Sequence, residues 1–171
     1  MFDGPTIHLA LNHVPVIGSA GILLILLLAV VLKREAYTRL ALGLAVLVAL
    51  VTIPVLRSGE PAEKRIEHQP GVEERWIEPH EDLAQVSAWV MFCFGAIAAL
   101  ALFAARGGRA LASWVTPVAL AFALGASTLM AITAHRGGMI RHLELRPGYT
   151  PAAAPAGEKA DEDAPGKPPA H

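Results

Sequence analysis

Residues 14–32 read VPVIGSAGILLILLLAVVL and carry no charged side chain. Their 19 positions come close to the roughly 20 residues that an α-helix needs to cross the hydrocarbon core of a bilayer. Pro15 falls in the first turn of such a helix, and Gly18 and Gly21 make its outer half narrow enough for a close neighbour. The stretch therefore predicts a membrane-spanning helix.

Three more uncharged segments follow, and together with the first they predict the fold class. Each is long enough to cross a bilayer, with some tilt for the longer ones. We expect an all-α protein, an integral membrane four-helix bundle with short helical segments in the loop between the second and third spans. The expected spans are about 14–33, 39–57, 83–105 and 110–134, within a transmembrane domain of residues 1–146.

The composition of the chain agrees with the membrane class. Hydrophobic residues make up 54% of the 171 positions and the mean hydropathy is +0.47, both high for a soluble domain. The net charge of −1 gives no argument for nucleic acid as a partner. Residues 147–171 are rich in proline and alanine and lack an apolar period, so we expect a disordered tail there.

The segment 58–82 is the one long polar loop between the spans. Ser58-Gly59-Glu60-Pro61 is typical of a helix cap followed by a proline in the first turn, which predicts a short helix over 60–68. Gln69-Pro70-Gly71 is expected to end it, and Glu78-Pro79 to begin the next long helix.

The connections 33–39 and 106–109 lie on the same side of a four-span topology. Their charged residues are five bases and one acid: Lys33, Arg34, Arg39, Arg106, Arg109 and Glu35. Because short basic connections stay in the cytoplasm, we expect a multi-pass protein of the bacterial inner membrane. Both termini and the 58–82 loop then lie on the periplasmic side.

The same topology gathers histidines at the periplasmic ends of three spans. His8 and His13 precede the first span, His80 precedes the third, and His135 and His142 follow the fourth. Ionisable groups at membrane depth are costly, and they indicate a functional site. His8 and His13 are separated by about 140° around an ideal helix, so they face one point only if the helix bends between them. We expect His13 as a ligand and His8 in a supporting role.

Two cofactor chemistries fit these residues. One is haem b, with imidazoles from two helices, glycines as a slot for the ring and an arginine for the propionates. The residues expected for it are His13, His80, His142, His8, Arg141, Gly137 and Gly138, with Arg136, Gly18 and Gly21 as additional candidates. The other is a zinc, iron or copper ion held by histidines and carboxylates. The ligands expected for it are His13, His80, His142, Glu60 and Glu63.

The leading hypothesis for function is electron transfer at the periplasmic face, with a respiratory or periplasmic redox partner. A non-haem metal-binding protein is one alternative, and a cofactor-free accessory subunit that docks through its acidic loop is another. For any single histidine, the simplest alternative is an interfacial side chain without a ligand. A stand-alone enzyme is disfavoured, because the sequence has no phosphate-binding glycine loop and no dinucleotide fingerprint.

Four motifs in chain order resemble the DUF2231 family of small bacterial membrane proteins. They are His8 with Asn12-His13-Val14-Pro15, the SGEPAE segment at 58–63, His80-Glu81, and the GGMIRH segment at 137–142. The motifs cover residues 8–144. The resemblance implies four membrane helices and a redox or haem-related role, although the activity of that family is not established. His135 and the longer loop with Glu60 and Glu63 depart from the family pattern, which argues against His135 as a ligand and against a plain haem assignment.

Overall fold

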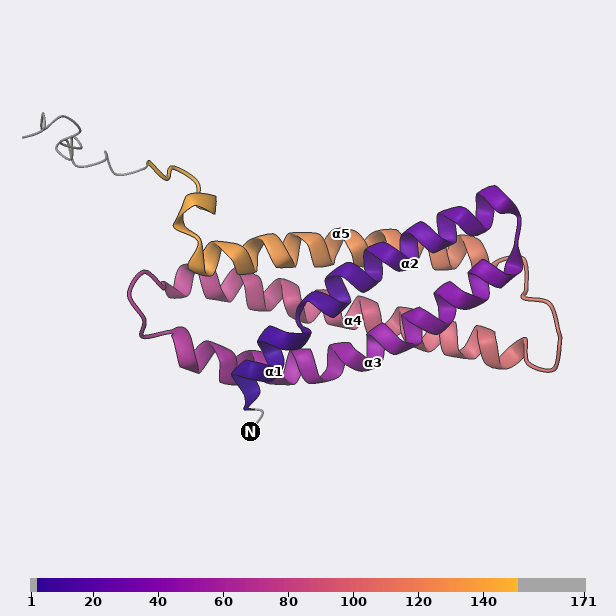
Figure 1. Ribbon diagram of the computed structural model, residues 1–171, viewed down its shortest axis with the longest axis horizontal. Helices are drawn as coiled ribbons and strands as arrows, with labels where there is room; N and C mark the ends of the chain where they lie inside the picture. Colours follow the sequence, from indigo (N-terminus) through magenta and orange to yellow (C-terminus); the bar gives the residue numbers. More distant parts are fainter. Residues whose placement is uncertain (1–2, 151–171) are drawn as a thin grey trace, which may run out of the picture.

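The computed structural model describes residues 3–150, and within that range the chain is helical with no β-strand. Four long helices run side by side, and a short helix lies against one end of the bundle (Figure 1). The prediction of an all-α four-helix bundle is confirmed. Most of the expected disordered tail, residues 151–171, lies outside the described residues. The elements are α1 (Gly4–Leu11), α2 (His13–Leu32), α3 (Glu35–Ile66), α4 (Glu74–Ala104), α5 (Val115–Arg141) and the 3₁₀ turn η1 (Leu143–Leu145).

Four helical segments are long and apolar enough to cross a membrane, namely α1 with α2, then α3, α4 and α5. Helix α3 has 32 residues and α4 has 31. At 1.5 Å per residue they are about 48 and 46 Å long, against a hydrocarbon core of roughly 30 Å. Charged residues return at 57–66 of α3 and 74–82 of α4. These parts of the two helices therefore project beyond the apolar spans at the same end of the bundle.

Helix boundaries differ from the prediction in the loop between α3 and α4 and in the segment between α4 and α5. No separate helix forms over 60–68, because α3 continues through Pro54 and Pro61 to Ile66. The ring of Pro61 is covered by α1, since a Cβ on Gly4 would lie 2.7 Å from the Pro61 Cβ. Helix α4 begins at Glu74 and includes Pro79, and α5 begins at Val115 rather than near 110. Prolines thus marked helix boundaries less well here than they do in soluble proteins.

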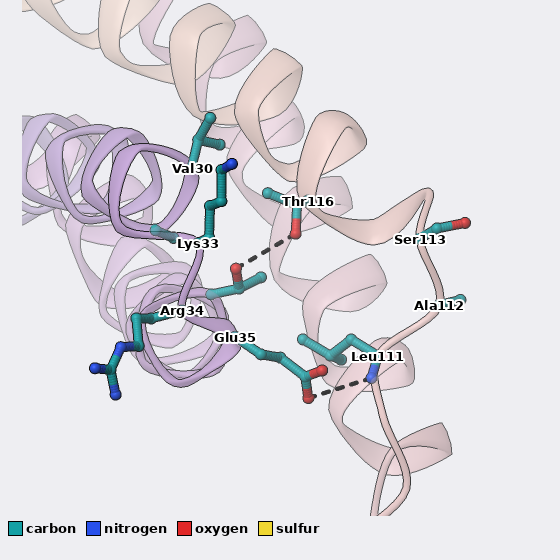
Figure 2. Close-up of a pocket in the computed structure, with 10 residues that line it drawn as sticks. Val30, Lys33, Arg34, Glu35, Leu111, Ala112, Ser113 and Thr116 are labelled. Carbon is teal, nitrogen blue, oxygen red and sulfur yellow. Dashed lines mark hydrogen bonds between the residues drawn. The ribbon is translucent and has the colours of Figure 1, made fainter.

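Polar contacts tie the loops together at the end of the bundle that carries the basic connections. Glu35 pairs with Arg39 at 2.6 Å and accepts a hydrogen bond from the Leu111 N–H at 3.3 Å. The hydroxyls of Thr38 and Thr116 are 3.3 Å apart and link α3 to α5 (Figure 2). We call this the basic-loop end of the bundle, and the opposite end the histidine end.

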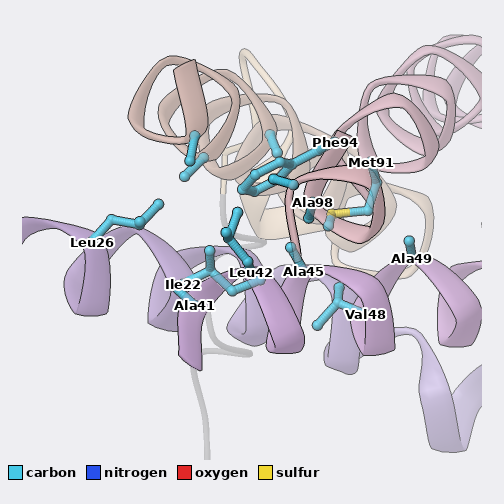
Figure 3. Packing of buried hydrophobic residues seen from close by; sticks show 14 of the residues in the cluster. Ile22, Leu26, Ala41, Leu42, Ala45, Val48, Ala49, Met91, Phe94 and Ala98 are labelled. Carbon is cyan, nitrogen blue, oxygen red and sulfur yellow. The ribbon is translucent and has the colours of Figure 1, made fainter. Parts of the chain in front are cut away.

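Small side chains allow the helices to pack closely in the middle of the bundle. A Cβ on Gly95 of α4 would lie 2.5 Å from the Ala49 Cβ of α3, so the two backbones meet at this point. Around them, Met91, Phe94 and Leu42 fill the interior (Figure 3). Many larger aliphatic side chains are exposed on the outside of the bundle, as expected for a surface that faces lipid. Close packing of small residues inside and apolar side chains outside is the pattern of a multi-pass membrane protein.

Candidate functional site

Helix α1 is held against the projecting part of α3, and this contact positions His8. Asp3 caps α1 and forms a 2.8 Å ion pair with Arg65 of α3. Farther along α1, Nδ1 of His8 lies 3.2 Å from the carbonyl oxygen of Val55. The hydroxyl of Ser58 is 3.5 Å from the same nitrogen. His8 therefore docks onto the backbone of α3 rather than pointing into the surrounding solvent or lipid.

His80 is placed in the same way between α4 and α5. Its Nδ1 lies 3.0 Å from the carbonyl oxygen of Thr133. Its ring covers Gly137, where a Cβ would come within 3.0 Å of the His80 Cε1. Arg136 donates a 2.9 Å hydrogen bond to the carbonyl of Pro79, which ties the adjacent turn of α4 to α5. The imidazole is fixed on three sides by the two helices.

Both histidine contacts use a glycine four residues after the carbonyl that accepts the hydrogen bond. Gly59 follows Val55 by four positions, and Gly137 follows Thr133 by four. In an α-helix the residue at i+4 donates its N–H to the carbonyl of residue i, so its side chain stands beside that carbonyl. A glycine at i+4 leaves the second lone pair of the carbonyl open to an imidazole. The Cβ that Gly59 lacks would lie 3.9 Å from the His8 ring, so the fit there is looser than at Gly137.

These contacts determine which ring nitrogen of each histidine carries the proton. A carbonyl oxygen can only accept, so Nδ1 of His8 and of His80 is the donor. In a neutral ring with Nδ1 protonated, Nε2 carries a lone pair, and within residues 3–150 it makes no hydrogen bond in either ring. Burial lowers the pKa of His80 below its usual 6.5, and so does a charge on the neighbouring His8, which keeps the ring neutral at pH 7. Neutral imidazoles anchored through Nδ1 are typical of metal ligands.

A pair of carboxyl groups lies beside this site on the projecting parts of α3 and α4. A hydrogen bond with Glu81, partial burial and the negative charges of Glu81 and nearby acids raise the pKa of Glu63 to about 7. Glu81 directly follows His80 in the chain. Glu60 is not part of the pair, because it is exposed and binds Lys64 at 2.6 Å. Near neutral pH the Glu63 carboxyl therefore holds a proton part of the time.

The other two histidines predicted as ligands are exposed, whereas His8 and His80 are partly buried. His13 begins α2 on its exposed side. His142 follows the end of α5, is exposed, and contacts the Glu144 carboxylate at 2.9 Å. Arg141 binds the Gln69 side chain across to the α3–α4 loop. Among the described residues, no three side chains of His, Cys, Asp or Glu are grouped closely enough to hold a metal ion.

Three of the four glycines expected to form a slot for a ring face side chains of the protein, and Gly21 has no atom within 4 Å of the position that a Cβ would take. Gly137 is covered by His80 itself, and a Cβ on Gly138 would lie 3.0 Å from Cδ1 of Leu145. In α2, a Cβ on Gly18 would lie 2.6 Å from a methyl group of Val48. Of these glycines, Gly137 is the one that contacts a candidate ligand.

The role of His8 was signalled by a stripe that the sequence prediction did not use. His8, Asn12, Pro15 and Ser19 are spaced by four, three and four residues, as on one face of a continuous helix, and Pro15 and Ser19 are buried in α2. The stripe continues down the buried side of α2. The side-chain oxygen of Asn12 is also buried and has no hydrogen-bond partner in the described part of the chain. His13 falls off this stripe.

Arg146 is a second residue that the sequence pattern did not single out. Its side chain is only 9% exposed and donates to the carbonyls of Met139, Ile140 and Gly71 at 2.8–2.9 Å. It also pairs with Glu73 at 3.0 Å. One guanidinium thus caps the end of α5 and ties it to the α3–α4 loop, which closes the histidine end of the bundle. Its fork of donors makes this possible.

Comparison of the chain with models of known protein families, with curated protein sequences and with solved structures finds no match. The geometry of the histidine end therefore carries the functional argument.

Proposed function

We propose that the protein binds a haem b at its histidine end and passes electrons there, with His8 and His80 as the ligands of the iron. The observation that carries the proposal is the shared construction of the two imidazoles. Each comes from a different helix, each donates Nδ1–H to a backbone carbonyl of a neighbouring helix, and each leaves Nε2 free. A haem iron with two imidazole ligands alternates between its ferric and ferrous states and so carries one electron.

The number of available donors favours a haem over a bare ion. A structural or catalytic metal ion usually needs three or four protein ligands. A macrocycle supplies four nitrogens, so that two imidazoles from the protein are sufficient. The described residues offer two such imidazoles and no group of three ligands. For a ring to enter, side chains at this end would have to move, among them Leu145, which lies over Gly138 and is 43% exposed.

The proposed cellular setting follows from the charges of the loops. The basic connections at 33–39 and 106–109 favour a cytoplasmic location for the basic-loop end. The histidine end would then face the periplasm of a bacterial inner membrane, where a respiratory or periplasmic redox protein could exchange electrons with it. The acidic residues of the α3–α4 loop would meet a partner with a basic surface.

A second candidate function is the binding of a non-haem metal ion, namely zinc, iron or copper. The observation that favours it is the carboxyl pair of Glu63 and Glu81, which lies beside His80. Ionisation of the pair would add oxygen ligands to the imidazole nitrogens. This site would need further side chains to come together, because the described residues hold no group of three such ligands.

The test is an optical spectrum with metal analysis on the full chain, purified in detergent without chelators from haem-replete cells. The haem proposal predicts a Soret band and sharp α and β bands after reduction. A colourless protein with a stoichiometric metal ion would support the second candidate. A colourless protein that contains no metal and does not change on addition of haem would contradict both, and would leave the accessory-subunit hypothesis.

A further inference from the structure

A hollow opens at the basic-loop end, far from the histidines and independent of the function proposed for them. It has a volume of about 230 Å³ and lies between the end of α2, the start of α3 and the segment before α5 (Figure 2). Ligand pockets for drug-sized molecules measure roughly 300–1,000 Å³, so this hollow suits a smaller group. Its walls include Lys33, Thr38, Thr116, Val30 and Leu111.

Lys33 gives the hollow its positive charge. Its side chain extends beside Val30 on the side of α2 that faces α5, whereas Arg34 points away (Figure 2). Lys33 is also the one non-glycine residue with a positive φ in the described part of the chain, at 51°. A left-handed conformation costs a lysine about 1 kcal/mol relative to glycine, the residue that usually ends a helix in this way.

The one carboxylate in the wall does not cancel this charge. Glu35 is occupied by Arg39 at 2.6 Å and by the Leu111 N–H at 3.3 Å. Thr38 and Thr116 add hydroxyl groups; one donates to the other at 3.3 Å, which leaves one hydroxyl hydrogen to donate to an anion. With Arg34 and Ser113, which also line the hollow, the wall combines cations, hydroxyls and an acid that is paired with Arg39, which suits an anionic group.

The hollow lies at the depth of lipid headgroups. Trp114, which directly precedes α5, is 55% exposed, and Tyr37 in the first turn of α3 is 38% exposed. Exposed tryptophan and tyrosine at helix ends mark the interface between hydrocarbon and water. The exposed aliphatic side chains of α2, such as Val31 and Leu28, begin directly beside the hollow. A molecule bound here would place one end among polar groups and the other along an apolar helix surface.

From this arrangement we infer that the hollow binds the headgroup of an anionic phospholipid. The phosphate would lie between the Lys33 ammonium and the two threonine hydroxyls, and the acyl chains along the outside of α2. Basic pockets between membrane helices are known to take anionic lipid headgroups in this way. The zwitterionic phosphocholine headgroup would bind more weakly, because its trimethylammonium cation would face Lys33.

The test is lipid binding to the full chain in a neutral detergent, followed by native mass spectrometry with phosphatidylglycerol or phosphatidylcholine. We expect phosphatidylglycerol to bind in preference to phosphatidylcholine. Lys33→Gln should weaken phosphatidylglycerol binding about fivefold, as expected for the loss of one cation near a lipid phosphate. Lys33→Arg should retain binding, and Lys64→Gln at the opposite end of the bundle should leave it unchanged.

Three results would overturn the inference. The first is equal binding of the two lipids by the wild-type protein. The second is an equal loss of phosphatidylglycerol binding in Lys33→Gln and Lys64→Gln, which would indicate a general effect of charge. The third is full displacement of the lipid by millimolar inorganic phosphate, which would assign the hollow to a free anion.

Discussion

The glycine beneath His80 offers a direct test of how the histidine end is built. In Gly137→Ala the new Cβ would lie 3.0 Å from the His80 Cε1 and 3.2 Å from its Nδ1. Both distances are shorter than an ordinary contact, so the ring must shift away from Thr133 and weaken its 3.0 Å hydrogen bond. Gly59→Ala is the matched control, because its Cβ would lie 3.9 Å from His8, an ordinary contact distance.

The expected energies of the two substitutions have opposite signs. Replacing glycine by alanine within a helix gains about 1 kcal/mol, and Gly59→Ala should show most of this gain. Gly137→Ala should have the same gain, but it loses a hydrogen bond worth about 0.5–1.5 kcal/mol and adds overpacking of about 1–3 kcal/mol. The free energies of unfolding of the two variants should therefore differ by about 3 kcal/mol, with Gly137→Ala the less stable.

Reversible unfolding in mixed detergent micelles, followed by circular dichroism, measures this difference. Nitrogen chemical shifts of the imidazoles provide a second readout, because protonated and unprotonated ring nitrogens are well separated. Gly59→Ala should keep the proton of both histidines on Nδ1, and Gly137→Ala should lose this preference at His80 only. Equal stabilities of the two variants, together with unchanged imidazole spectra, would refute the docking of His80 over Gly137.

Further predictions concern the carboxyl pair, the packing of the core and the closure of the histidine end. The pKa of Glu63 is about 7 in the folded chain against 4.5 for a free glutamate, so the folded chain binds this proton more tightly. The free energy of unfolding should therefore fall as the pH rises from 4.5 to about 7. Glu81→Gln should flatten this part of the pH profile; a slope that survives would disprove the coupling. Gly95→Ala should destabilise the protein by about 1–3 kcal/mol in the same unfolding assay, whereas Gly125→Ala, with no atom within 4 Å of its Cβ, should not. Arg146→Lys should cost about 1–3 kcal/mol in that assay, because a single ammonium cannot replace the guanidinium fork; an unchanged midpoint would contradict its closing role.

The four-helix bundle could be predicted because it follows from uncharged segments of sufficient length. A stretch such as 14–32 has few other stable solutions, since lipid leaves every backbone group to be satisfied within the helix. The helix ends were harder to predict. Pro61 looked like the first turn of a new helix, yet α1 packs on its ring and α3 continues past it. That contact depends on Gly4, which is 57 positions away in the chain and cannot be recognised from local propensity.

The candidate site could be predicted at the level of its location but not of its individual residues. The topology correctly placed His8, His13 and His80 at the same end of the bundle. Choosing between the first two required knowing which side of α1 packs on α3. The spacing of the buried residues of α2 favours His8, whereas the expected bend favoured His13, which lies on the exposed side of α2. The carbonyl partners of the imidazoles are backbone atoms, and their positions depend on the packing of helices that are distant in sequence.

The most direct test of the central proposal is a haem titration of the wild-type chain and of three single histidine variants. We predict that the wild-type protein and His13→Ala each bind one haem per chain, with the spectrum of low-spin iron that has two imidazole ligands. His8→Ala and His80→Ala should each lose this spectrum, because each removes an anchored Nε2 donor. Its loss in His13→Ala with retention in His8→Ala, or no haem binding by the wild-type protein, would contradict the account.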